Sequence, residues 1–402
     1  MFGTKIRLMD NRILYFGNFK FPHGNAAGSR VLGNAYSLRD LGNKVTFVDF
    51  DENVKANASI PKVYDNFNCY SFASPRIVDR IFFFKYLNEI KRIIEKEKIN
   101  ILIMYGNPVV SIIQLILIGY CKRNNIKLII DIADWHSANS GSYLIRIVKY
   151  LDISFRMKYL NTRSDGVITV SSYLKNYYNL KGLNSIVIPP LINKNKFVNL
   201  KFELNPKLLT LIYVGQPFPN NNGRSVSKSA YKDRLDIVIE SLFNLKNRRF
   251  IFNIYGITKK EYLQVINDHH EILKDLEDNV IFHGKVENSL ILNFISNSDF
   301  SILFRENSRL SNAGFPTKFV ESVSCGTPMI TTFTSDLEKY ISVNKLGFGV
   351  SPDSISDFRD LLERILTISK NDILEMKNHC FNSHVFSYEN FTKDFEKFLK
   401  LI

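Results

Sequence analysis

The sequence contains few cysteines and no long apolar run, and each absence excludes a class of protein. Its four cysteines, Cys69, Cys121, Cys325 and Cys380, are scattered and form no C-x-x-C pair. This spacing argues against a disulfide scaffold and against a structural zinc site. No segment reaches the roughly 18 apolar residues of a transmembrane helix. The most apolar segment, 109–119, has the length of a buried helix.

The N-terminus also lacks the layout of a signal peptide, and residues 1–17 run directly into a strand-like segment. Together with the absence of a transmembrane run, this predicts a cytoplasmic protein. No metal site and no cofactor are expected.

Acidic residues are outnumbered, with 53 Lys and Arg against 39 Asp and Glu and a formal net charge of +14. Nucleic acid, an anionic membrane surface and a phosphorylated small substrate are the partners that suit such a charge. The lysines are dispersed and no RRM, KH or helix-turn-helix signature appears, so no nucleic-acid partner is expected. Peripheral contact with the inner face of the cell membrane and a phosphorylated substrate both stay open.

Short apolar segments alternate with segments of helical periodicity along the chain, which is typical of α/β proteins with parallel sheets. A chain of 402 residues exceeds one ordinary core, so two domains are expected. The alternation restarts after a polar segment rich in Asn and Lys. We therefore predict an N-terminal domain at 1–192, a linker at 193–206, a C-terminal domain at 207–385 and a closing helix at 386–402.

Two segments in the first half of the sequence are candidate ligand-binding sites. The segment 21–29 reads as a Gly/Pro loop, in which Gly24, Ala27 and Gly28 keep side chains away from a ligand, or simply form a tight turn. It lacks the G-x-G-x-x-G fingerprint of dinucleotide sites.

Asp134 and His136 follow a predicted strand at 127–132, at the end where ligands bind in open α/β sheets. A histidine near an aspartate can relay a proton near neutral pH, and the alternative is a loop histidine without a task.

A predicted helix at 77–97 carries aromatic and basic residues, with Ile81–Phe84 beside Lys85. It would either meet lipid headgroups or pack its apolar face into the core.

The segment 305–332 reads as a loop, a helix, a turn and a buried strand. Thr317, Lys318 and Glu321 fall on the first turns of the helix, after Pro316. A helix N-terminus beside a lysine suits a diphosphate, and a carboxylate one turn later suits sugar hydroxyls. The alternative is an ordinary surface helix with a Lys–Glu pair.

Several sequence runs, in their order and spacing, resemble the GT-B glycosyltransferases, most of all family 4 (glycosyl transferases group 1). They are YFG, IDIADWH, DGVITVSSYLK, IVIPPLI, IYVG, KDRLDIVIESL, FNIYG, VIFHGKVENSLI and FPTKFVESVSCGTPMITT. The resemblance implies two facing Rossmann-like α/β domains with an interdomain cleft, and a C-terminal helix that packs back toward the N-terminal domain. It also implies acceptor binding on the first domain and nucleotide-sugar binding on the second.

The resemblance further implies roles for individual residues. Asp134 and His136 would be catalytic, and Glu321 would hold the ribose. The donor phosphates would be bound by Lys232, Lys318, Arg305, Gly314, Phe315 and Thr317. The base would lie on the turn that contains His283, Gly284 and Val286, and the loop with Gly24, Ala27 and Gly28 would face the cleft.

Three positions depart from the family pattern. Ala313 stands where the first Glu of the E-x7-E motif would be, and Gln216 stands where many relatives have Arg. In the family the histidine of the catalytic region often precedes an aspartate, whereas here Ala133 precedes Asp134 and His136 lies two residues after it.

The expected function is a retaining glycosyltransferase of hexosyltransferase type that needs no metal. It would move a sugar from a nucleotide-diphosphate sugar to a saccharide or lipid-linked acceptor in bacterial surface polysaccharide biosynthesis. One alternative is a nucleotide-sugar 2-epimerase of the same fold, and Ala313 and the few histidines count against it. The other is a non-catalytic basic protein that binds membrane or nucleic acid.

Overall fold

The computed structural model describes residues 10–22, 25–51, 54, 60–73, 84–106, 111–135, 143–197, 200–218 and 231–402. The chain folds into two compact units. Unit 1 comprises Met1–Asn193, Ala313–Phe315 and Phe386–Ile402, and unit 2 comprises Lys194–Asn312 and Pro316–Val385. The segment predicted as a linker is thus counted with unit 2 from Lys194 onward, and the closing helix belongs to unit 1.

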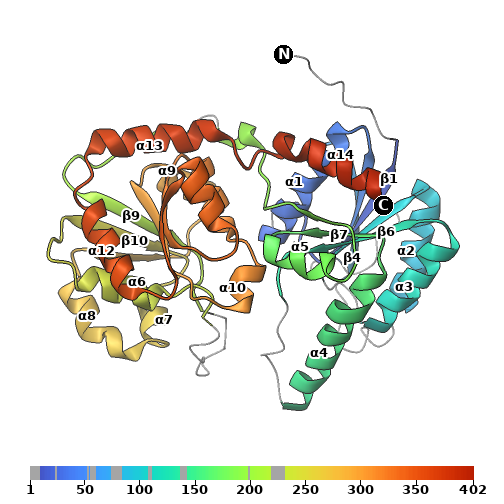
Figure 1. The fold of residues 1–402 in the computed structure, drawn as a ribbon, viewed down its shortest axis with the longest axis horizontal. Coiled ribbons are helices and arrows are strands. Elements are labelled where there is room, and N and C mark those ends of the chain that lie inside the picture. Colours follow the sequence, from blue (N-terminus) through green and yellow to red (C-terminus); the bar gives the residue numbers. More distant parts are fainter. Residues whose placement is uncertain are drawn as a thin grey trace. The chain divides into compact units, whose positions relative to one another are not determined.

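Unit 1 is built on an eight-stranded sheet in the order β3-β4-β2-β1-β5-β6-β7-β8 (Figure 1). Only the β3–β4 pair is antiparallel among the pairs described. The strands are β1 (Arg12–Gly17), β2 (Lys44–Asp51), β3 (Lys62–Tyr64), β4 (Phe67–Ala73), β5 (Ile101–Tyr105), β6 (Lys127–Ile132), β7 (Gly166–Thr169) and β8 (Ser185–Val187). The α-helices are α1 (Ala26–Asp40), α2 (Phe84–Glu97), α3 (Ser111–Arg123), α4 (Tyr143–Phe155), α5 (Ser172–Asn179) and α14 (Thr392–Leu401).

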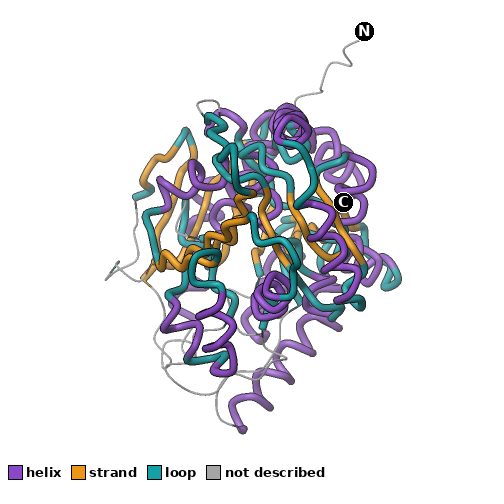
Figure 2. Tube along the Cα trace, turned by 90° about the vertical axis from the view of Figure 1, so that its left-hand side faces the viewer, coloured by secondary structure: helices purple, strands orange, loops and turns teal. Residues whose placement is uncertain are grey.

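Unit 2 is built on a six-stranded parallel sheet in the order β11-β10-β9-β12-β13-β14. Its strands are β9 (Leu209–Val214), β10 (Phe250–Tyr255), β11 (Val280–Gly284), β12 (Phe300–Leu303), β13 (Met329–Thr332) and β14 (Gly347–Val350). Its α-helices are α6 (Leu235–Phe243), α7 (Lys259–Leu263), α8 (His270–Asp275), α9 (Asn288–Ser296), α10 (Arg309–Ala313), α11 (Thr317–Ser324), α12 (Ile355–Ile365) and α13 (Lys370–Ser383). Figure 2 distinguishes the strands from the helices by colour.

The central strands are apolar on both faces because helices cover both faces of each sheet. In β1, Ile13, Leu14, Tyr15 and Phe16 are all fully buried. The C-terminal helix α14 contributes to the same core of unit 1 through Phe395, Phe398 and Leu399. This packing explains why the last residues of the chain belong to the first unit.

The start of α1 lies earlier than the sequence predicted. The side chain of Asn25 accepts a hydrogen bond from the Gly28 N–H (2.9 Å) and caps the helix. Ala27 and Gly28, expected in a loop, are therefore helical, which corrects that prediction. A Cβ on Gly28 would lie 2.7 Å from the carbonyl oxygen of Phe19, so the small residue accommodates the chain's own loop.

The β3–β4 hairpin was not predicted, although its turn has a recognisable signal. Asp65 and Asn66 both adopt positive φ angles, of 46° and 65°, as the central residues of a type I′ turn do.

The predicted lipid-facing helix is described only from residue 84 onward. Its apolar residues Leu87, Ile90 and Ile94 are buried, so α2 packs into the core. Ile81–Phe83 and the side chains of Phe84 and Lys85 lie outside the described residues. Among the described helices, none has both the length and the apolar character needed to cross a membrane.

Candidate functional site

A buried aspartate joins two cations at the carboxyl edge of the unit 2 sheet. Nε of Arg305 donates to Oδ1 of Asp233 (2.8 Å) and Nζ of Lys318 donates to Oδ2 (2.7 Å). The hydroxyl of Tyr213 also donates to Oδ2 (2.9 Å). We call Asp233, Arg305, Lys318 and Tyr213 the Asp233 cluster. It brings together two of the predicted phosphate-binding residues, Arg305 and Lys318.

Both cations of the cluster are held in position by the local structure. Arg305 follows β12, where its N–H donates to the hydroxyl oxygen of Thr332 (3.0 Å) and its carbonyl accepts from that hydroxyl (2.6 Å). Nζ of Lys318 lies 5.3 Å from the ring centre of Tyr213. A Cβ on Gly215, which has a φ of 139°, would lie 2.5 Å from Cε of Lys318. The glycine at the end of β9 therefore makes room for the lysine.

The two neighbouring cations keep the carboxyl group of Asp233 ionised. Burial by itself would raise the pKa of Asp233, but the neighbouring Lys318 and Arg305 outweigh it and hold this pKa well below its usual range. One carboxylate thus neutralises one of two cations. The cluster keeps one net positive charge, which suits an anionic ligand.

Helix α11 places Lys318 and Glu321 one turn apart, and no side chain caps its N-terminus. Unused N–H groups at a helix start, beside a lysine, are a general way to bind phosphate. Thr317 is the first residue of this helix and is partly buried. Pro316 is its N-cap.

Glu321 is an acid whose pKa is altered by its surroundings. Burial raises its pKa above the ordinary value, and the nearby Lys318 only partly counteracts this. In the described part of the chain, no group donates a hydrogen bond to its carboxylate. The Glu321 side chain is partly exposed, so its carboxylate oxygens are open to accept hydrogen bonds from a ligand's hydroxyl groups.

The turn predicted to hold the base lies at the end of β11. The His283 ring stacks on Tyr255 at 4.3 Å with an interplanar angle of 8°, and its Nε2 pairs with Oδ1 of Asn253 (2.8 Å). Partial burial lowers the pKa of His283. Gly284 is buried, and its carbonyl accepts from the Gly256 N–H (2.7 Å). Val286, the third predicted residue of this turn, is partly buried.

The remaining predicted phosphate-binding residues lie apart from the cluster's contacts. Lys232 precedes Asp233 in the chain and its side chain is exposed. Gly314 and Phe315 are buried and belong to unit 1, where the Phe315 ring lies 5.9 Å from the ring of Phe386.

Unit 1 has its own candidate residues at the end of β6. Asp134 is partly buried, and its charge is one of the influences that raise the pKa of Tyr105, after burial and Asp131. The Trp135 ring lies 5.0 Å from that of Tyr177. His136 and Gly24 lie outside the described residues.

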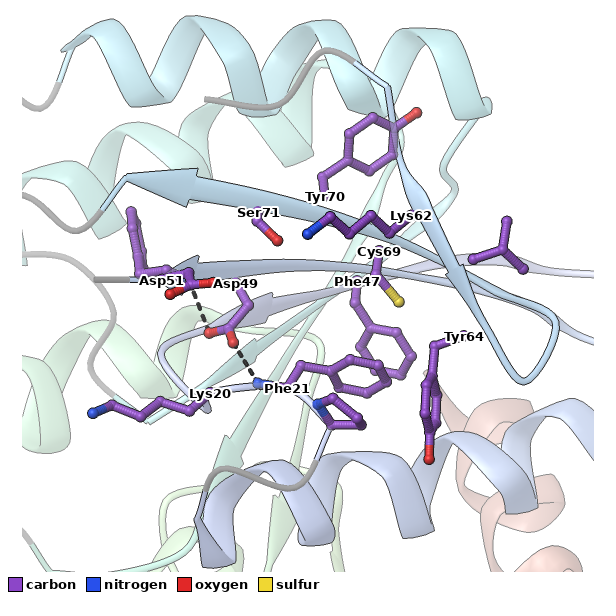
Figure 3. A pocket seen from close by; sticks show the side chains of 13 residues that line it. Lys20, Phe21, Phe47, Asp49, Asp51, Lys62, Tyr64, Cys69, Tyr70 and Ser71 are labelled. Carbon is purple, nitrogen blue, oxygen red and sulfur yellow. Dashed lines mark hydrogen bonds between the residues drawn. The ribbon is translucent and has the colours of Figure 1, made fainter. Parts of the chain in front are cut away.

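A cavity of about 490 Å³ opens in unit 1 between the loop after β1 and the strands β2 and β4 (Figure 3). Aromatic and charged side chains line it together, among them Phe21, Tyr64, Lys20, Lys62 and Asp51. The carboxylate of Asp49 accepts hydrogen bonds from the backbone N–H groups of Phe19 (2.8 Å) and Phe21 (2.6 Å), which fixes the loop. Aromatic faces beside polar groups suit a saccharide.

The sequence alone did not single out Asp233. It lies 85 residues from Lys318 and 72 from Arg305, so no local pattern links the three. The available signal was an acid at the start of a predicted helix, in the run KDRLD.

Residues 224–380 match the family model described as Glycosyl transferases group 1. No curated protein sequence matches the chain.

Solved structures share the fold over nearly the whole length. A glycosyltransferase from Rickettsia africae aligns with a TM-score of 0.66 and 15% identity, covering 98% of each chain. Sucrose-phosphate synthase from Thermosynechococcus elongatus aligns with a TM-score of 0.65 and 13% identity, covering 97% of this chain and 98% of that one. HepE from Anabaena, solved with UDP and glucose, aligns with a TM-score of 0.62 and 11% identity, covering 98% and 100%.

At such low identities the structural likeness establishes the fold, and the family model matches the part of the chain that contains most of unit 2. The chain has the GT-B fold, and its residues 224–380 match the glycosyl transferases group 1 model, which supports a glycosyltransferase.

Proposed function

We propose that the chain is a retaining hexosyltransferase that takes a sugar from a nucleotide-diphosphate donor bound on unit 2. The observation that carries this proposal is the partly exposed Glu321 carboxylate, whose pKa is raised by burial and which has no donor in the described part of the chain. It lies one helical turn from Lys318 of the Asp233 cluster. A ribose next to a diphosphate presents hydroxyl groups and negative charge at this spacing.

The donor would be held by groups that are already in position. Lys318, Arg305 and the N-terminus of α11 would bind the diphosphate, with Thr317 beside them. Glu321 would accept hydrogen bonds from the ribose, and the base would lie on the turn of His283, Gly284 and Val286. HepE binds UDP in a chain of the same fold, so uridine diphosphate sugars are the first donors to test.

In the reaction, an acceptor hydroxyl oxygen bonds to the anomeric carbon while the bond from that carbon to the diphosphate oxygen breaks, and the hydroxyl proton passes to the leaving diphosphate. Negative charge then develops on the leaving diphosphate. Lys318 and Arg305 would stabilise this charge, so we propose that no metal ion is needed. Retention of the anomeric configuration is what the family resemblance implies, and Asp134 and His136 stay the proposed catalytic pair.

The acceptor would be a saccharide, either free or linked to a lipid, in the synthesis of a bacterial surface polysaccharide. The aromatic and charged cavity of unit 1 is the proposed place for it. We place this activity in the cytoplasm, at the inner face of the membrane where the acceptor is lipid-linked.

Incubation with a panel of nucleotide sugars and with acceptors tests the donor site, with release of nucleotide diphosphate as the readout and EDTA present in one series. We expect Lys318→Ala to lower kcat/KM for the donor by about 100- to 1,000-fold, as for loss of one transition-state charge partner. Lys260→Ala, an exposed lysine of the same unit, is the matched control.

The proposal is wrong if no donor is turned over and Lys318→Ala binds every donor as the wild type does. Epimerised sugar nucleotide formed without an acceptor would instead identify a 2-epimerase. Loss of activity in EDTA, restored by a divalent cation, would overturn the metal-independent mechanism.

A further inference from the structure

Helix α4 presents a continuous apolar stripe to solvent. Leu144, Val148, Leu151 and Phe155 recur at the spacing i, i+4, i+7 and i+11, so they share one side of the helix. Their side chains are 74%, 66%, 60% and 44% exposed, and no residue of α4 is buried. Scattered apolar residues are ordinary on a surface, whereas a continuous stripe marks an interaction site.

The apolar surface extends beyond the four residues of the stripe. Tyr143 and Tyr150 on α4 are exposed, as are Tyr159 just beyond it and Ile112 on the neighbouring helix α3. Figure 1 shows α4 extending away from the sheet of unit 1. The helix therefore offers most of its circumference, rather than one edge, to a partner.

Two of the three charged residues of α4 are cations. Arg146 and Lys149 are exposed and three residues apart, so they share a face of α4 away from the stripe. Asp152 is the only acidic residue of α4. Its carboxylate is already used, because it accepts from the Ser111 N–H (2.9 Å) and from Arg156 (2.7 Å). An apolar helix with this excess of cations complements an anionic, apolar partner.

We propose that α4 docks unit 1 on an anionic lipid bilayer, lying in the plane of the interface. Leu144, Val148, Leu151 and Phe155 would insert among the acyl chains. Arg146 and Lys149, on the narrow polar face, would remain at the level of the lipid phosphates. With 13 residues the helix is about 20 Å long, too short to span the bilayer.

A second copy of the chain suits this surface less well. The chain has a formal net charge of +14, and two α4 helices packed together would bring their cations close. An anionic bilayer neutralises the same cations, and each one near it favours binding. The inference deepens the proposed function, since a lipid-linked acceptor is met at a bilayer, but its test needs no sugar nucleotide.

Sedimentation with vesicles of phosphatidylcholine alone, or mixed with phosphatidylglycerol, tests the docking at low and high salt. We expect the wild type to bind the anionic vesicles and to be released by salt. Leu144→Ser combined with Leu151→Ser should lower the partition coefficient at least roughly tenfold, because two leucines no longer insert. Arg146→Glu combined with Lys149→Glu should lower it by a similar factor on anionic vesicles.

Matched controls lie elsewhere on unit 1. Leu180→Ser removes a leucine that is 89% exposed but lies off the stripe, and Lys393→Glu reverses an exposed lysine on α14. Both should bind like the wild type. Circular dichroism and thermal melting confirm that every variant is folded.

The proposal is overturned if the wild type stays in the supernatant with anionic vesicles, or if the double leucine variant sediments with them equally well. It is also overturned if light scattering shows a wild-type dimer that the double leucine variant converts to a monomer, since the stripe would then join two copies. Vesicle binding without turnover of any nucleotide sugar would support the docking and contradict the proposed function.

Discussion

The ammonium group of Lys318 lies 2.7 Å from Oδ2 of Asp233, and this ion pair organises the cation site of unit 2. Asp233 also binds Arg305, so it keeps two like charges close together before any ligand arrives. Without the carboxylate, repulsion would drive the two cations apart. A site arranged in advance loses less free energy to reorganisation when charge develops on a leaving group.

Gly215→Ala should disturb Lys318 without removing a charge. The added Cβ would lie 2.5 Å from Cε and 2.8 Å from Nζ of Lys318, so the flexible end of the lysine must move away from Asp233. The residue also has a φ of 139°, which favours glycine. We expect kcat/KM for the donor to fall by about tenfold or more, as when a charge partner is misplaced. Steady-state kinetics check this, and wild-type values would contradict the role given to Lys318.

Asp233→Asn should destabilise unit 2 at neutral pH. The two cations would face a neutral amide, which typically costs about 3–5 kcal/mol for a buried pair broken on one side. Because the pKa of Asp233 is lowered in the folded state, its stabilisation is present above the unfolded pKa of about 3.9 and is lost as pH falls toward the folded pKa.

Urea denaturation at pH 7 and near pH 3 measures this effect. The difference between the wild type and Asp233→Asn should be large at pH 7 and should shrink in acid. Asp353→Asn, at an exposed position, is the control. A difference that stayed constant with pH would contradict a charged Asp233.

Glu321→Gln should separate binding from stability. The glutamine keeps the shape but accepts weaker hydrogen bonds, so KM for the donor should rise about 10- to 100-fold. The free energy of unfolding at pH 7 should increase, although donor binding weakens. Burial raises the folded pKa of Glu321, so the folded state holds the proton longer and loses stability as pH rises from about 4.3 through the folded pKa.

The variant should therefore be more stable than the wild type at pH 7, while binding its donor less well. Thermal melting at pH 5 and pH 7, together with donor titration, gives both quantities. A variant that was less stable and bound donor normally would show that Glu321 has only a structural role.

The strands of both sheets could be predicted because apolar runs such as 12–17 and 208–215 are buried on both faces. The β3–β4 hairpin was not predicted because its two strands lie at one edge of the sheet. They are only partly buried and mix polar with apolar residues. The start of α1 was misplaced because Ala and Gly at 26–28 resemble a loop, and the Asn25 cap decides otherwise.

The candidate site was predictable only where one segment supplies it. Lys318 and Glu321 share one helix, so their spacing was visible in the sequence. Arg305 opens the same segment and was expected at the site through the family resemblance, whereas Asp233 comes from a distant segment and meets Lys318 only in the folded unit. The exposed face of α4 was not predicted either, because an apolar helix sequence does not reveal which side the rest of the unit covers.

The buried lysine of α13 gives a prediction in the alkaline range. Lys377 is fully buried, and Nζ donates to the carbonyl of Ser298 (2.6 Å) and to the hydroxyl oxygen of Thr327 (2.9 Å). Burial lowers its pKa to about 8. The unfolded chain then binds more protons than the folded one between about pH 8 and pH 10.4, so this group makes stability rise with pH across that window.

Lys377→Met should abolish this rise, because it fills the same space without a charge to bury. Relative to the variant, the wild type should gain up to about 3 kcal/mol from pH 8 to the upper end of the window, the equivalent of a shift of this size. Lys377→Arg is the informative counterpart. Since an arginine cannot lose its proton, that variant should be strongly destabilised at pH 8 and should stay so at pH 9.5. Urea denaturation at half-unit pH steps decides the matter, and parallel curves for the wild type and Lys377→Met would rule out a titrating lysine in this core.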